Sequence, residues 1–195
     1  MLQLLKYFSL SLIFLFILSV SYAITPGTYV GLNAGETALS LPDTNLNKSA
    51  DFGGRAYAGY NFNEYLGVEA GVAHYGNAKY KSFEYNTNAL DIVAKTYLPF
   101  GEKRFNIFAL GGIAAVNSIT KANHNEEISI NDFVPNSKTR IRPIYGAGVG
   151  YDIPKSHFTA TIEVTRIQGV GDLKSSPHSM PSANMVSVGL TYNFD

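Results

Sequence analysis

The stretch GGRAYAGYNFNEYLGVEAGV, residues 53–72, decides the fold, because each of its halves alternates with period two. The even positions hold Ala56, Ala58, Tyr60 and Phe62 before Asn63-Glu64, and Leu66, Val68, Ala70 and Val72 after it. Glycine and polar residues take most of the odd positions. Strict alternation over five to ten residues indicates strands rather than a helix. The stretch therefore predicts an antiparallel hairpin with a tight turn at Asn63-Glu64.

The same alternation recurs along the chain and predicts eight strands. They cover about 29–38, 53–62, 65–75, 90–98, 108–114, 140–151, 158–167 and 186–194. In the fifth strand the pattern assigns Phe108, Leu110, Gly112 and Ala114 to the apolar face. Ala109, Gly111 and Ile113 then fall on the opposite face.

The connections between these strands are unequal in a regular way. Those after strands two, four and six are short, at 63–64, 101–104 and 154–156. The others are long and polar, at 39–52, 76–87, 117–139 and 168–182. Short turns at one end and long loops at the other are typical of an up-and-down barrel. In bacterial outer-membrane barrels the short turns face the periplasm and the long loops face outward.

Composition excludes several classes of protein. The 195 residues are 46% hydrophobic and 15% charged, with a formal net charge of zero. No basic excess is available to neutralise nucleic-acid phosphates, and the chain is too apolar and aromatic for a disordered protein. With no cysteine there is no disulfide framework, thiol nucleophile or thiolate metal site.

The N-terminus has the features of a secretory signal. Lys6 precedes an apolar run at 7–20, and Ser21-Tyr22-Ala23 offers small residues at a cleavage site. The run is shorter than the roughly 20 residues that a spanning helix needs, although an uncleaved anchor is the alternative. We expect a signal peptide at 1–23 and a barrel domain at 24–195.

The apolar face distinguishes a membrane barrel from a soluble, lipocalin-like one. Opposite the aliphatic stripe lie Gly, Asn, Ser, Thr and a few charges, which suit the narrow interior of an eight-stranded barrel. Five aromatic residues share the apolar face near the short turns and predict a girdle at the membrane boundary: Tyr60, Phe62, Tyr151, Tyr192 and Phe194. We therefore expect an all-β, eight-stranded antiparallel transmembrane barrel, with lipid outside and hydrophilic side chains in its middle.

Several stretches resemble the transmembrane domain of outer membrane protein A. They are 54–60 through 67–71, Ala94-Lys95, 110–112, 142–149 and the closing 187–194. The resemblance implies residence in the outer membrane of a Gram-negative bacterium and recognition of the last strand by the barrel-assembly machinery. We expect no counterpart of the family's periplasmic peptidoglycan-binding domain.

Charged residues with inward parity form a predicted lumen network. Its members are Arg55, Glu69, Lys95 and Glu163, with Asp91 and Arg142 on the same face but nearer the outer rim. Isolated charges in a dry lumen are costly, so they should pair. The resemblance implies that Glu69 and Lys95 form lumen ion pairs, but the family's usual partners fall at Thr161 and Gly150. We expect Arg55 to pair with Glu69, and Lys95 to turn to Glu163 or Asp91.

Residues that could suggest chemistry have simpler explanations. The pair His178-Ser179 could suggest a lipid-deacylating enzyme but lies between two prolines in an expected loop. The other histidines, His74, His124 and His157, lack partners at metal-ligand spacing, apart from Glu126-Glu127 after His124. Gly146, Gly148 and Gly150 repeat without a following helix and so make no dinucleotide fingerprint. We expect no catalytic, cofactor or metal site.

The function expected from these patterns is that of a rigid membrane scaffold whose long loops make external contacts. A narrow pore lined by the lumen charges is the alternative, and a lipid-modifying enzyme is a third. Expected partners are outer-membrane lipid and lipopolysaccharide, together with a host or surface ligand at the loops. Arg166 has lipid-facing parity and could meet lipopolysaccharide phosphates if it lies near the outer rim.

Overall fold

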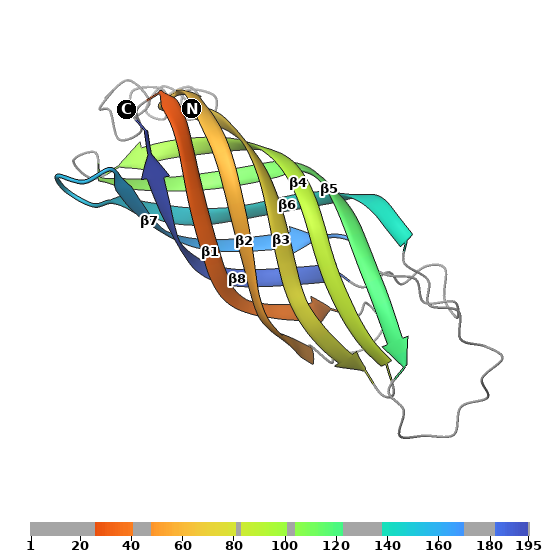
Figure 1. Cartoon of the computed structure of the whole chain (residues 1–195). Coiled ribbons are helices and arrows are strands. Elements are labelled where there is room, and N and C mark those ends of the chain that lie inside the picture. The colour runs from red at the N-terminus through yellow and green to blue at the C-terminus, as the bar shows by residue number, and fades with distance from the viewer. Residues whose placement is uncertain are drawn as a thin grey trace, which may run out of the picture.

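The protein is a closed barrel of antiparallel strands in its computed structural model, which describes residues 26–40, 48–80, 83–100, 104–122, 138–169 and 182–194. The strands in these ranges are β1 (Gly27–Ser40), β2 (Lys48–Asn63), β3 (Leu66–Tyr80), β4 (Phe83–Phe100), β5 (Phe105–Ala122), β6 (Lys138–Asp152), β7 (Phe158–Ile167) and β8 (Ser182–Asn193). Each strand pairs with its neighbours in chain order, and β8 pairs back onto β1, with Tyr29 opposite Asn193. The first strand therefore begins and the last strand ends at the same end of the barrel (Figure 1). The expected signal peptide, residues 1–23, lies outside the described residues.

The short turns define one end of the barrel, called here the turn end. The Asn63 side-chain oxygen accepts hydrogen bonds from the backbone N–H groups of Tyr65 and Leu66, at 2.8 and 2.9 Å. At the β6–β7 turn the backbone N–H of Ser156 donates to the carbonyl of Ile153 at 3.2 Å. The predicted short connections are confirmed to within one or two residues.

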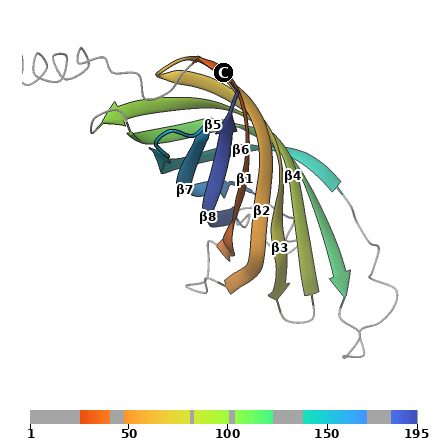
Figure 2. The same cartoon turned by 60° about the vertical axis from the view of Figure 1, so that its left-hand side comes forward.

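At the opposite end, called the loop end, the strands extend further than the sequence predicts. Between described strands, the connections cover 41–47, 81–82, 123–137 and 168–181. The expected loop at 76–87 is therefore wrong, because β3 runs to Tyr80 and β4 starts at Phe83. Figure 2 shows β3 and β4 continuing side by side to this end. Polar residues there obscure the alternation but do not end the pairing.

The predicted division into two faces is confirmed on seven of the eight described strands. Large apolar side chains coat the outside, among them Val30, Leu32, Val72, Leu90, Ile92, Val149, Ile162, Val164, Val186 and Val188. The side chains that alternate with them point inward and are buried, and they include both polar and apolar residues. The phase predicted for an outer wall that contacts lipid is therefore correct for β1 to β4 and β6 to β8.

The phase predicted for β5 is wrong. Phe108 and Leu110 are 1% and 5% exposed and face the lumen, whereas Ile107 and Ile113 are 47% and 56% exposed and face outward. The strand is apolar on both faces, so its own alternation does not decide the phase. The pairing does: Phe108 lies opposite Gly148 of β6, whose missing side chain leaves room for the ring.

Candidate functional site

A buried network of ion pairs lies on the lumen side of β2, β3 and β4. The Arg55 guanidinium donates to Glu69 at 2.8 Å, and to both oxygens of Asp91 at 2.6 and 3.1 Å. The Lys95 ammonium donates to the other oxygen of Glu69 at 2.9 Å. All four side chains are at most 4% exposed. Every charge in this network is therefore met by an opposite charge, as burial requires.

The geometry confirms one expected pairing, and it corrects a second pairing and the expected position of Asp91. Arg55 is the partner of Glu69, as its parity predicts. Lys95 binds Glu69, not Glu163 or Asp91. Asp91 lies within the network, not at the outer rim, because Arg55 reaches it across Gly71, where a side chain would leave no room.

Aromatic rings enclose the lysine of this network. The Lys95 ammonium lies 4.0 Å from the ring centroid of Phe108, 5.5 Å from that of Tyr97 and 5.7 Å from that of Tyr57. Cations are attracted to ring faces at such distances. Tyr29 donates a further hydrogen bond to Glu69 at 3.1 Å. These rings were missed in the sequence because no single strand carries them and because β5 was assigned the opposite phase.

Glu163 of β7 is buried in the lumen within electrostatic range of Lys95 and Arg55, but no hydrogen bond joins it to the network. It is 1% exposed, and neither carboxylate oxygen has a hydrogen-bond partner among the described residues. The hydroxyls of Thr161 and Thr165, on the same face of β7, also have no hydrogen-bond partner among the described residues. The polar side chains of β7 therefore form a second group of lumen residues, distinct from the paired charges.

An apolar layer fills the lumen between the charged network and the loop end. Its buried members are Ala73, Tyr75, Ala89, Ala114, Val116, Ile144, Ile167, Ala183 and Met185, and they pack in one cluster with Val93, Phe108 and Leu110. The expectation of hydrophilic side chains in the middle of the barrel is therefore confirmed for the ion-pair network and wrong for this apolar layer. An eight-stranded barrel is narrow enough for side chains to fill it, and here apolar ones do so in its loop half.

Aromatic side chains cluster on the outer wall near the turn end. The structure places Tyr60, Phe62, Tyr151, Tyr192 and Phe194 there, and adds Phe100, Phe105 and Phe158, which the sequence reasoning missed. Their ring centroids lie 4.8–5.7 Å apart in three groups. Phe105 was missed for the same reason as Phe108, the phase of β5.

Polar side chains bound the apolar wall at its other side. Outward positions near the loop end hold Glu36, His74, Asn88, Asn117, Thr139, Arg166 and Asn184. On β4, Asn88 is ten residues from Leu98. At a rise of about 3.3 Å per residue and a strand tilt of about 40°, this spacing is about 25 Å along the membrane normal. That height matches the apolar band of an outer-membrane barrel. Arg166 lies on this boundary, next to the last residue of β7, and its guanidinium donates to Ser182 at 3.2 Å.

Comparison with known proteins decides the family. Residues 8–194 match the model of the outer membrane protein beta-barrel domain. The chain belongs to this family. It is an outer-membrane protein, and its fold is of the outer membrane protein A type.

Two curated proteins and two solved structures show what the chain is similar to. An uncharacterized protein of Coxiella burnetii is 28% identical, over 82% of this chain and 75% of its own length. Outer membrane protein A of Klebsiella aerogenes is 27% identical, over 78% of this chain and 43% of its own, so the chain spans less than half of that relative. Neisserial surface protein A superposes with a TM-score of 0.64 at 17% identity, covering 86% of this chain and 97% of its own. Ail of Yersinia pestis superposes with a TM-score of 0.57 at 13% identity, covering 88% and 100%.

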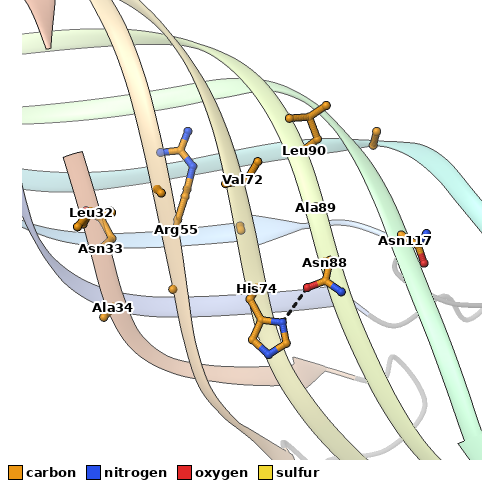
Figure 3. A pocket seen from close by; sticks show the side chains of 14 residues that line it. Leu32, Asn33, Ala34, Arg55, Val72, His74, Asn88, Ala89, Leu90 and Asn117 are labelled. Atoms are coloured by element: carbon orange, nitrogen blue, oxygen red, sulfur yellow. Dashed lines mark hydrogen bonds between the residues drawn. The ribbon is translucent and has the colours of Figure 1, made fainter. Parts of the chain in front are cut away.

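Two further features were not found in the part of the chain that the structure describes. No helix there is long and apolar enough to span a membrane. Nor do the described ranges contain three His, Cys, Asp or Glu residues grouped to hold a metal ion. His74 bonds Asn88, at 2.8 Å (Figure 3). His124, His178 and Ser179 lie outside the described residues.

Proposed function

We propose that this family member is a closed scaffold without enzymatic activity, whose loop-end connections contact ligands outside the cell. The observation that carries the proposal is the filling of the lumen. Ion pairs block the lumen beside β2–β4, and the apolar layer blocks the lumen toward the loop end. Passage of an ion would separate buried pairs, and each separation leaves a charge uncompensated at a cost of about 3–5 kcal/mol.

A narrow pore is the second candidate, and one observation favours it. Glu163 is a buried carboxylate without a described hydrogen-bond partner, and it could receive the Lys95 ammonium if that group left Glu69. The exchange would open a path only if the apolar layer also parted. The scaffold is therefore the better-supported function, and lipopolysaccharide, the barrel-assembly machinery and a surface ligand are its proposed partners.

Planar-bilayer recording separates the scaffold from the pore. We expect the purified barrel to give no stable channels, and Glu163→Gln to leave the recording unchanged, because the apolar layer closes the lumen independently of Glu163. A porin of known conductance in the same bilayer shows that channels are detectable. Stable channels whose open fraction changes in Glu163→Gln would contradict the scaffold and support the pore.

Epitope insertion tests which end of the barrel faces outward. A tag in the β5–β6 connection, residues 123–137, should bind antibody on intact cells, because long connections face outward in this type of barrel. The same tag in the β6–β7 turn, residues 153–157, is the control and should bind only after the outer membrane is permeabilised. Labelling of the turn but not the loop on intact cells would reverse the proposed orientation.

A further inference from the structure

Two adjacent rows of outward side chains cross β1 to β5 in the loop half of the barrel. In the pairing order of the strands, the first row is Leu32, Ala56, Val72, Leu90 and Ala115, and the second is Ala34, Gly54, His74, Asn88 and Asn117. These ten residues, together with Asn33, Arg55, Ala73 and Ala89 from the inward positions beside them, line a hollow of about 780 Å³ (Figure 3). The hollow is called here the wall groove.

The shape of the wall groove follows from the sizes of its residues. Leu32, Val72 and Leu90 are more than half exposed and stand out from the wall. Gly54 and Ala56 lie between them on β2 and form the floor, because they have almost no side chain to fill the space. Five strands spaced about 4.8 Å apart give the groove a length of about 19 Å.

The wall groove slants through the membrane band because the strands are tilted. Ala34 is seven residues from Gly27, where β1 begins, whereas Asn117 is twelve residues from Phe105, where β5 begins. The β1 end of the groove is therefore deeper in the band, and the β5 end reaches its outer boundary. The deep end is lined by aliphatic residues and glycine, and the shallow end by His74, Asn88 and Asn117.

The polar end of the groove presents an oriented imidazole. His74 Nδ1 lies 2.8 Å from the side-chain oxygen of Asn88 and donates to it (Figure 3). That hydrogen bond holds the ring beside Asn88. An imidazole in this tautomer can accept from a sugar hydroxyl through Nε2, and a protonated imidazole can donate to a phosphate. A phosphorylated sugar is the headgroup chemistry that suits this end.

We propose that the wall groove binds one lipopolysaccharide molecule, with an acyl chain along the floor at Gly54 and Ala56 and its phosphorylated sugar at His74. The groove is apolar deep in the membrane and polar at the membrane boundary. This polarity matches that of an amphiphile inserted from the outer leaflet. The length of the groove is comparable to one leaflet, which is half of the roughly 30 Å hydrocarbon core. The inference rests on the outward orientation of the loop end, which the epitope experiment tests separately.

Native mass spectrometry of the delipidated barrel, reloaded with rough lipopolysaccharide, measures the proposed complex. We expect one retained lipopolysaccharide molecule at collision energies that remove phosphatidylglycerol. Ala56→Leu fills the floor and should lower the retained fraction at least ten-fold, and His74→Ala should lower it several-fold. Ala147→Leu, an outward alanine on β6 outside the groove, is the matched control and should retain lipid as the unmodified protein does.

Three results would overturn the proposal. Equal retention by Ala56→Leu and Ala147→Leu would show that the groove does not hold the lipid. Equal retention of phosphatidylglycerol would show unspecific lipid contact. A dimer that Ala56→Leu dissociates would assign the groove to a second copy of the chain. Heat-modifiable migration on gels, which reports a folded barrel, must be the same for all variants compared.

Discussion

Replacing Arg55 by alanine should lower the free energy of unfolding by about 3–5 kcal/mol, the largest effect expected from one lumen substitution. The guanidinium serves two carboxylates, Glu69 and Asp91, with contacts of 2.6–3.1 Å. Lys95 still meets Glu69 in the variant, but Asp91 loses its ion pair with Arg55. Urea titration of the refolded barrel in lipid vesicles, followed by gel mobility, measures the loss.

Two further variants show whether the effect comes from the charge. Arg55→Ala combined with Asp91→Asn removes the stranded carboxylate, and it should recover part of the stability because the two residues are coupled. Arg166→Ala removes an exposed arginine on the outer boundary and should change the stability by no more than about 0.5 kcal/mol. A loss for Arg55→Ala as small as that for Arg166→Ala would contradict a structural role for the network.

The sequence predicts the parts of the barrel in which one face meets lipid. There the alternation is strict, so strand number, order, closure and the phase of seven strands follow from it. The pairing of Arg55 with Glu69 follows from their shared inward parity. Arg55 lies opposite Ala73 and Glu69 opposite Gly59, so the long arginine side chain spans four residues along the sheet. The alternation of apolar and polar residues is therefore sufficient to predict the structure where a tight hairpin or the bilayer constrains the chain.

The parts that the sequence does not predict depend on register between strands. Lys95 is opposite Gly67, which lets its ammonium reach Glu69 two residues further along β3. The Lys95 ammonium is enclosed by Phe108 because that ring points into the lumen, where Gly148 of β6 leaves room for it. The strand ends at the loop end lie beyond the apolar band, where neither face needs to be apolar and the alternation disappears.

The phase of β5 can be tested at Gly111, which the alternation alone assigns to the lumen. The structure places it outward, between Ala94 and Tyr145 of the neighbouring strands, and an added Cβ there meets no atom within 4 Å. It lies near the middle of the apolar band, six residues from the start of β5. Gly111→Lys should therefore cost about 2–4 kcal/mol in vesicles, the cost of a cation at the midplane of the lipid face.

Gly111→Leu is the variant that distinguishes the two phases. On an outer wall, leucine adds apolar surface against lipid and should leave the stability unchanged or raise it, whereas in a filled lumen leucine and lysine would both be destabilising. The chain contains no tryptophan, so Gly111→Trp also provides a single tryptophan whose fluorescence can be followed. Brominated lipid should quench that fluorophore strongly, and it should quench Phe108→Trp only weakly, because residue 108 lies inside the barrel. Strong quenching at 108 with little at 111 would return Phe108 to the outer face and remove the ring that encloses Lys95.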